Sequence, residues 1–323
     1  MTFRVTILGS SSALPTVRKH PSAHALNVHE QFFLIDCGEG TQTQLRRYGV
    51  SPLRVNCVFL THLHGDHVFG LFGLISTLGL LGRRTPLQVF APHSAEAMLR
   101  SHLQYFDAEL PYELQVTEVD TCKHRLIYEN KTLEVWTVPL RHRVPTAGYL
   151  FREKTPPRNI RKELIPAYGL SLAQIQAAKQ GRDITLSDGT LVPNAVLTYR
   201  PYVPRSYAYL SDTAYSAKAA GLVAGTDLLY HEATFMDADR RLARQTGHST
   251  ALQAARAALA AGAGRLLIGH FSSRYKDDAV LVDEARTVFP AADAATEGDT
   301  WDIRPRADDT ILASEAVSLI GRP

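Results

Sequence analysis

Cysteine is scarce in this sequence, and no two cysteines stand close together. The 323 residues contain only Cys37, Cys57 and Cys122. An odd number of widely spaced cysteines does not predict a disulfide framework, so we expect a reducing compartment. Because no CxxC pair is present, we do not expect a zinc finger either.

Long apolar runs are also missing. The longest, VFGLFGLISTLGLLG at 68–82, is rich in glycine and too short to span a bilayer, so we interpret it as a buried helix. The first residues, MTFRVTILGS, predict a strand rather than a signal peptide. We therefore expect a cytoplasmic protein with no membrane partner.

The sequence has no large excess of one charge. Its formal net charge is +3, and 45% of the residues are hydrophobic against 21% charged. This composition is typical of a soluble globular protein with a sizeable core. The small basic excess permits a polyanionic partner but does not argue for one.

Short apolar runs alternate with helical patterns along most of the chain. Strands are predicted at 3–8, 31–36, 56–61, 87–92, 133–138, 207–212, 227–232 and 265–270. Helices are predicted at about 40–48, 68–81, 93–104 and 249–264, the last with Ser249 as its N-cap. This alternation predicts an α/β architecture built of packed layers.

One segment interrupts the alternation. Residues 151–204 begin basic and proline-rich, and they contain one short helical pattern at about 171–180. Because the strands on either side belong together, we interpret 151–204 as an arm inserted into a single domain of residues 1–323.

The stretch THLHGDHVFG, residues 61–70, places three histidines and an aspartate within six positions. In extended chain His62 and His64 point the same way, because side chains alternate. Gly65 allows a tight bend, after which Asp66 and His67 can face a second point. Imidazole and carboxylate together suit zinc and similar divalent ions, so the stretch predicts part of a two-metal site.

Further candidate ligands stand where apolar runs end. His142 follows LEVWTVPLR, Asp212 follows YAYLS, and His270 follows LLIG. Asp36 ends FFLID, where it suits a hydrogen bond that orients a ligand histidine. The histidines that lack this placement are interpreted as solvated or locally bonded: His20, His24, His29, His93, His102 and His124.

With these partners, the HxHxDH pattern resembles the metallo-β-lactamase superfamily, and its details resemble ribonuclease Z, the tRNA 3′-processing endonuclease. HEATF (231–235), TGHST (246–250) and IGHFSSRY (268–275) narrow the resemblance to that branch. Other matching segments are ILGSSSALPT (7–16), FLIDCGEGTQTQLRR (33–47), PLRHRVPTAGY (139–149) and YLSDT (209–213). The resemblance implies a metallo-β-lactamase fold, a four-layer αββα sandwich with an inserted projecting arm.

The resemblance also implies two Zn²⁺ ions per subunit, with Mn²⁺ or another divalent ion as alternatives. The positions that match the ligands of the first ion are His62, His64 and His142. Those that match the second ion are Asp66, His67 and His270, and Asp212 matches the bridging carboxylate. Among the catalytic residues, Asp66 would accept a proton from the attacking water, and Glu232 would orient His248.

The implied reaction is removal of the 3′ trailer from precursor tRNA by two-metal phosphodiester hydrolysis, leaving a 3′-hydroxyl on the tRNA. The family is typically a homodimer whose arm grips tRNA. Candidate phosphate contacts here are Arg152, Lys154, Arg158, Arg161 and Lys162. The Gly-Pro-rich tip of many bacterial members is absent, since the corresponding stretch reads IPAYGLSLAQIQAAKQGRD.

Two other functions remain possible at this point. The same scaffold hydrolyses small phosphodiesters or other esters, and metal ligands alone do not separate these substrates from RNA. A noncatalytic RNA-binding subunit is the other alternative, and the seven filled ligand positions argue against it. The basic arm and the HEATF and GHST segments favour RNA.

Overall fold

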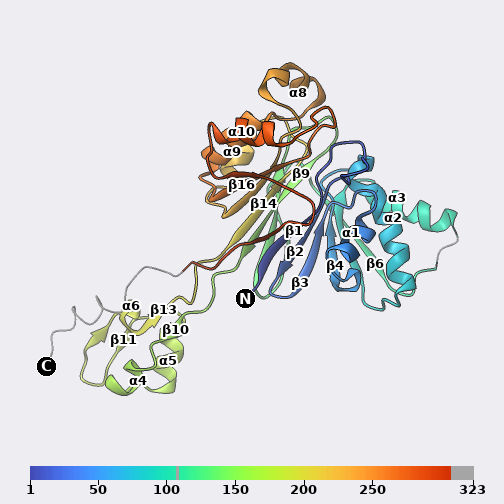
Figure 1. Ribbon diagram of the computed structural model, residues 1–323. Coiled ribbons are helices and arrows are strands. Elements are labelled where there is room, and N and C mark those ends of the chain that lie inside the picture. The colour runs from blue at the N-terminus through green and yellow to red at the C-terminus, as the bar shows by residue number, and fades with distance from the viewer. Residues whose placement is uncertain (107–108, 307–323) are drawn as a thin grey trace. The chain divides into compact units, whose positions relative to one another are not determined.

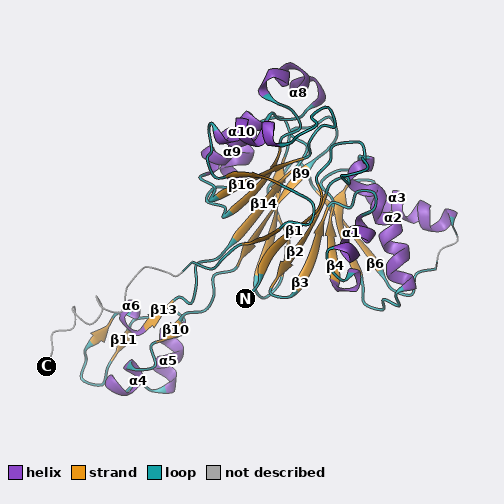
Figure 2. Cartoon of the chain, in the orientation of Figure 1, coloured by secondary structure: helices purple, strands orange, loops and turns teal. Residues whose placement is uncertain are grey.

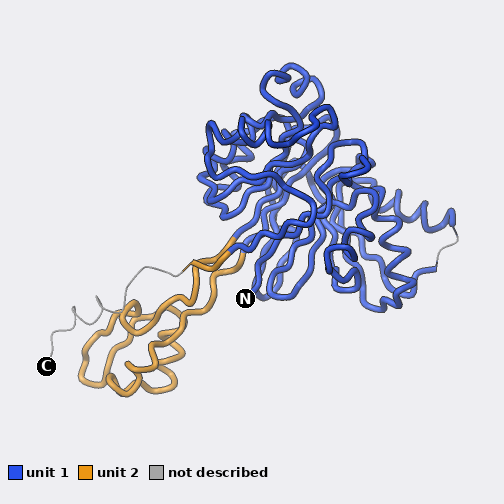
Figure 3. Tube along the Cα trace, viewed as in Figure 1, with its two compact units in different colours: residues 1–152, 206–303 blue, residues 153–205, 304–323 orange. Residues whose placement is uncertain are grey.

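The computed structural model describes residues 1–106 and 109–306 (Figure 1). The chain divides into two compact units (Figure 3). The larger unit contains Met1–Arg152 and Ser206–Ile303, and the smaller contains Glu153–Arg205 with residues 304–306. Within the described residues, no helix is long and apolar enough to cross a membrane.

Two seven-stranded sheets form the centre of the larger unit (Figure 2). The first sheet has the strand order β18 (Thr300–Asp302), β1 (Phe3–Gly9), β2 (Ala23–Val28), β3 (Gln31–Ile35), β4 (Val55–Phe59), β5 (Leu87–Pro92) and β6 (Leu114–Val119). The second has the order β17 (Ala292–Ala294), β16 (Arg265–Gly269), β15 (Leu228–Glu232), β14 (Ser206–Leu210), β9 (Ala147–Glu153), β8 (Leu133–Pro139) and β7 (Leu126–Glu129).

Alternating side chains give each sheet two apolar faces. On β14, Tyr207 and Tyr209 enter the core shared by the two sheets, whereas Ala208 and Leu210 enter the core on the other side. Successive side chains of a strand point to opposite faces, so a strand buried on both sides is apolar throughout. Phe33 and Phe59 of the first sheet meet Phe151 of the second in the shared core.

Helices cover the two outer faces. The helices α1 (Thr41–Arg47), α2 (Gly65–Leu80) and α3 (Ala95–Tyr105) share a buried core with the first sheet. The helices α7 (Ala217–Leu222), α9 (Ala251–Ala261) and α10 (Ala279–Arg286) share one with the second. A further helix, α8 (Arg240–Thr246), and two short 3₁₀ turns, Pro52–Arg54 and Asp237–Asp239, complete this unit. The four layers are those of the predicted αββα sandwich, which is confirmed.

Several elements differ from the prediction. Strands β2, β6, β7 and β9 were not predicted. His24 on β2 was interpreted as solvated or locally bonded. It is not solvated, because it is fully buried and its Nδ1 lies 2.7 Å from the Tyr207 hydroxyl. The N-cap of α9 is Thr250, whose side chain accepts a hydrogen bond from the Gln253 amide. Ser249 instead donates to the carbonyl of Thr213.

The smaller unit has a core of its own. Its elements are β10 (Asn159–Ile160), α4 (Leu164–Ala167), α5 (Leu172–Lys179), β11 (Ile184–Thr185), β12 (Leu191–Val192), α6 (Asn194–Leu197) and β13 (Thr198–Tyr199). The buried residues of its core are Leu170, Ala178, Ile184, Val192 and Leu197. Helix α5 begins after Ser171, which forms a capping box with Gln174. The unit overlaps the predicted arm, 151–204.

A buried ion pair closes the smaller unit where its chain enters and leaves. Arg205 donates from Nε to Glu153 Oε2 at 2.9 Å and from Nη2 to Oε1 at 2.6 Å. The two side chains are 2% and 0% exposed. Such a bidentate pair satisfies both charges, but removing one partner leaves the other charge buried without compensation.

We therefore predict that Glu153→Ala lowers the free energy of unfolding by about 3–5 kcal/mol. The matched control is Asp302→Ala, which breaks the exposed pair between Arg4 and Asp302 at 2.8 Å. That change should cost less than about 1 kcal/mol, because water screens the pair. Urea denaturation followed by circular dichroism measures both, and equal effects would contradict the prediction.

Candidate metal centre

The polar residues of the HxHxDH motif lie between β4 and α2. His62 and His64 follow the end of β4, and His64 is the extended N-cap residue of α2. The helix begins at Gly65, three residues earlier than predicted, so Asp66 and His67 occupy its first turn. A carboxylate is favoured in that turn, because the helix dipole is positive there. The turn therefore fixes both side chains more firmly than the predicted loop would.

Three of the site residues adopt a backbone conformation that non-glycine residues rarely enter. Their φ angles are 55° at Asp36, 29° at Asp212 and 59° at His270, and each follows the end of a strand. Left-handed backbone at such residues is strained and clusters at functional sites. This conformation turns the chain away from the strand direction near the end of each strand.

The candidate ligands gather in two adjoining groups. One contains His62, His64, His142 and Asp212, and the other contains Asp66, His67 and His270. Within each group, one ligand atom from every residue lies within 4.8 Å of those of the others. Residues that are separated by up to 208 positions in the sequence, His62 and His270, thus converge as predicted.

Asp212 stands between the two groups. Its Oδ2 lies 3.5 Å from Nε2 of His62 and 3.7 Å from Nε2 of His142. Its Oδ1 lies 3.2 Å from Nε2 of His67 and 3.1 Å from Nε2 of His270. One carboxylate oxygen therefore faces each group, which is the arrangement a bridging ligand requires.

A buried carboxylate, Asp36, orients two of these histidines. Its Oδ2 accepts a hydrogen bond from Nδ1 of His67 at 2.8 Å. The Thr61 hydroxyl donates to Asp36 Oδ1 at 2.9 Å, and its remaining lone pair accepts from His62 Nδ1 at 3.0 Å. Tyr209 donates a further hydrogen bond to Asp36 at 3.1 Å. Fixing Nδ1–H in this way leaves each Nε2 lone pair aimed at the centre.

A second buried carboxylate, Glu232 at the end of β15, repeats the arrangement. Its Oε1 lies 2.9 Å from Nδ1 of His248. The Thr234 hydroxyl donates to Glu232 Oε2 at 2.7 Å and lies 2.8 Å from Nδ1 of His270. The sequence did not single out Thr61 or Thr234, although each lies close to a predicted site residue.

Neighbouring charged groups shift the pKa values of the site residues. Burial alone would raise the pKa of Asp212, but positive charge on His270, His67 and His62 outweighs it and holds the pKa well below its usual range. Burial lowers the pKa of His248, whereas the adjacent Glu232 carboxylate raises it, and the outcome is a pKa of about 9. The Glu232 carboxylate therefore favours the protonated form of His248.

The donor set fits divalent metal ions. Nε2 of His67 is buried and has no hydrogen-bond partner among the described residues, although Nδ1 of the same ring is bonded. An orphaned imidazole nitrogen beside two carboxylates and two other imidazoles is typical of a metal ligand. The clusters of histidine and aspartate are typical of a binuclear metal site.

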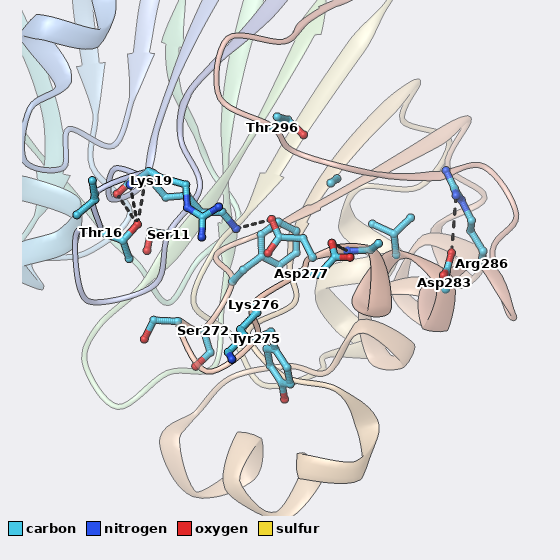
Figure 4. Close-up of a pocket in the computed structure, with 18 residues that line it drawn as sticks. Ser11, Thr16, Lys19, Ser272, Tyr275, Lys276, Asp277, Asp283, Arg286 and Thr296 are labelled. Carbon is cyan, nitrogen blue, oxygen red and sulfur yellow. Dashed lines mark hydrogen bonds and ion pairs between the residues drawn. The ribbon is translucent and has the colours of Figure 1, made fainter.

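A cavity of about 740 Å³ opens where the segment after His270 meets the loop after β1 (Figure 4). It is lined by the loop around Ser11–Lys19 and by the segment from Phe271, which follows His270, to Arg286. Lys19 bridges the two sides, because its ammonium group pairs with Asp278 and lies 5.1 Å from the centre of the Phe271 ring. One residue of the cavity wall, Phe271, thus directly follows the candidate ligand His270 in the chain.

The predicted RNA contacts on the arm lie in unlike settings. Arg152 is exposed on β9, and Lys162 is exposed in the smaller unit. Arg158 donates to the Thr198 hydroxyl at 2.6 Å, and Arg161 lies 5.6 Å from the centre of the Tyr199 ring. Lys154 is partly buried. Arg158 and Arg161 therefore also contribute to the packing of the smaller unit.

The two sheets and the histidine–aspartate clusters define a metal-dependent hydrolase of the metallo-β-lactamase fold. The metallo-β-lactamase fold protein YhfI from Bacillus subtilis is 19% identical and has a TM-score of 0.66, with 94% of this chain and 100% of that chain covered. A family model described as "Anti-Pycsar protein Apyc1" matches residues 3–154.

More specific matches come from ribonuclease Z. The ribonuclease Z of Porphyromonas gingivalis is 46% identical over 295 residues, which cover 91% of this chain and 97% of that protein. The structure of human tRNase Z, short form, has a TM-score of 0.67 at 26% identity and covers 93% and 99% of the two chains. The chain belongs to the ribonuclease Z family of tRNA 3′-processing endonucleases.

Thr61 offers a test of how the centre is held together. Thr61→Val keeps the side-chain shape but removes the hydroxyl that links Asp36 to His62. We predict that metal affinity falls about 10–100-fold, because partners of ligand histidines have effects of that size. Thr61→Ser keeps the hydroxyl and should stay close to wild type. Metal titration with a chromophoric chelator measures the affinities, and unchanged binding in Thr61→Val would contradict the role of the relay.

Proposed function

We propose that this chain removes the 3′ trailer from precursor tRNA with two zinc ions and leaves a 3′-hydroxyl on the tRNA. The observation that carries the proposal is the position of Asp212, with one carboxylate oxygen facing each group of ligands. Family membership supplies the substrate class. The proposed ligands are His62, His64 and His142 for one ion, Asp66, His67 and His270 for the other, and Asp212 for both.

Two zinc ions at such a site supply Lewis acidity and neutralise the charge that develops in a phosphoryl transfer. The protein residues do the rest. We propose that Asp66 accepts the proton of the attacking water. Its Oδ2 lies 3.4 Å from Nε2 of His270 and accepts a 2.8 Å hydrogen bond from the Ala13 amide, which fixes the carboxylate.

His248 is proposed as the group that protonates the leaving 3′ oxygen. Its Nδ1 lies 2.9 Å from Glu232 Oε1, and the pKa of about 9 supports a protonated ring at neutral pH. The ring stacks on His270 with centroids 5.2 Å apart. Because Nδ1 faces Glu232, Nε2 is the atom that would deliver the proton.

The decisive experiment is incubation of the purified protein and Zn²⁺ with a 3′-extended precursor tRNA, with the cut mapped to the nucleotide. A single cut at the trailer junction that leaves a 3′-hydroxyl supports the proposal. The alternative function is hydrolysis of small phosphodiesters or other esters. Turnover of a chromogenic phosphodiester without any cut in precursor tRNA would favour that alternative.

His248 and Asp212 should separate catalysis from metal binding. We predict that His248→Ala keeps both metal equivalents but lowers turnover by about 10²–10⁴-fold, the usual contribution of general acid catalysis. Asp212→Ala should lose metal as well. Elemental analysis alongside cleavage assays distinguishes the two. Since His248 also lies within 4.8 Å of Asp212 and His270, loss of metal in His248→Ala would show that it is a ligand instead.

We propose that the smaller unit binds tRNA through its cationic side chains, as an arm of the single domain. Lys162 is the exposed candidate within it. Each phosphate contact makes binding weaken with salt, so Lys162→Ala should reduce the slope of log affinity against log salt by about 1. Lys218→Ala, an exposed lysine on α7, is the control and should leave the slope unchanged. A flat salt dependence in the wild type would exclude an electrostatic grip.

We also propose a cytoplasmic homodimer that uses a groove beside α2 and α3. The groove encloses about 750 Å³ and is lined by Phe72, Leu80, Phe106 and Pro111 among others. Leu80 is 87% exposed and Phe106 is 64% exposed. The apolar stretch 68–82 thus has a core face and an exposed face.

A charge placed in the groove tests the dimer. We predict that Leu80→Glu yields a monomer, because a buried unpaired carboxylate is costly at an apolar interface. Leu259→Glu, at a 60% exposed position on α9, should keep the mass of the wild type. Light scattering after gel filtration gives the masses, and a monomeric wild type would refute the dimer.

A further inference from the structure

Phe69, one turn into α2, is an apolar side chain held at the surface beside the metal centre. Its ring is 61% exposed. The ring packs directly over Gly65, since a Cβ added there would lie 2.3 Å from Cε2 and 2.5 Å from Cζ of Phe69. Residues four apart face each other on a helix, so a side chain at position 65 would require the Phe69 ring to leave this place.

This contact changes the predicted reason for glycine in the HGDH motif. Gly65 was expected to permit a tight bend, but it does not appear among the residues with positive φ. It is the first residue of α2, and what it lacks is the side chain that would displace Phe69. The motif therefore fixes an exposed aromatic ring as well as the ligands.

The ring forms one wall of a small cavity next to the centre. The cavity encloses about 300 Å³ and is lined by Ala13, Pro15, Pro21, Glu39, Gly65, Asp66 and Phe69. Asp66, a candidate ligand, belongs to the same wall. The Ala13 amide, at φ 56°, donates to Asp66 Oδ2 at 2.8 Å and ties the opposite loop to the centre. The cavity therefore has an apolar lining broken by the carboxylates of Glu39 and Asp66.

We propose that Phe69 is the stacking platform for an unpaired nucleobase adjacent to the scissile phosphodiester. This inference rests on the proposed function, because it assumes that the centre cuts RNA. A phosphodiester held at the centre carries a nucleotide on each side, and the cavity beside Asp66 offers the nearer base a flat apolar face. Stacking on an aromatic ring tolerates every base, because each has a π-face. Such a platform suits an enzyme whose substrates differ in sequence at the cut.

The test compares Phe69→Ala with wild type on a 3′-extended precursor tRNA and on the same RNA with an abasic residue on either side of the cut. We expect Phe69→Ala to lower kcat/KM about 5- to 150-fold on the intact RNA, which corresponds to 1–3 kcal/mol per stacked base. On one of the two abasic substrates, the kcat/KM of wild type should fall by the same factor. The kcat/KM of Phe69→Ala on that substrate should equal its value on the intact RNA. Phe69→Tyr, which keeps the ring, should restore cleavage.

Three controls keep the outcomes distinct. Leu259→Ala removes an apolar side chain of matched exposure, 60%, on α9 and should cleave like wild type. Metal content should be unchanged in Phe69→Ala, because Phe69 is not one of the candidate ligands and its ring has no atom that coordinates a metal ion. Its mass in solution should also match wild type, since a variant that becomes monomeric would assign Phe69 to contact with a second copy and overturn the proposal.

Two further results would overturn the inference. An equal loss in Phe69→Ala on the intact RNA and on both abasic RNAs would show that no base stacks on the ring. A loss of less than about twofold on the intact RNA would do the same, because even weak stacking exceeds it. A wild type that leaves the intact precursor uncut refutes the proposed function itself, whereas cleavage that is indifferent to Phe69 refutes only the platform.

Discussion

The metal centre depends on two buried carboxylates that each hold a pair of histidines. Asp36 binds His67 directly and His62 through Thr61, and Glu232 binds His248 directly and His270 through Thr234. Burying a carboxylate is costly unless several donors satisfy it. Asp36 also receives the backbone N–H of Thr61, and Glu232 receives that of Thr213. Each carboxylate is therefore stable only where the strand ends deliver those donors, so the site and the sandwich stabilise each other.

Much of this fold and centre could be predicted from the sequence. An apolar run followed by a polar residue can be recognised in the sequence alone, and this pattern identified Asp36, Asp212 and His270 as candidates. The positive φ angles of these three residues could not be predicted from the sequence, because the surrounding structure imposes the strain and the residue type does not. Thr61 and Thr234 were missed for a related reason. A threonine becomes a relay only when two other groups are brought to its hydroxyl.

The errors have local physical causes. His24 was interpreted as solvated or locally bonded because it does not stand at the end of an apolar run, yet it packs against Tyr209 and Tyr230 in the shared core. Helix α2 begins at Gly65, before the apolar run from which it was predicted, so its first turn holds two of the site residues. In the smaller unit, basic and proline-rich composition indicated an insertion but concealed the apolar positions that give it a core.

The two ends of that insertion lie on neighbouring strands of the second sheet. Strands β9 and β14 pair antiparallel, with Arg152 directly opposite Ser206. The chain thus departs and returns at neighbouring points of one ladder, where a short hairpin would join the strands without disturbing their register. Segments of different length and sequence can be exchanged at this junction while the chemistry stays intact. A change confined to the inserted segment can therefore leave the strands that carry the candidate metal ligands unaltered.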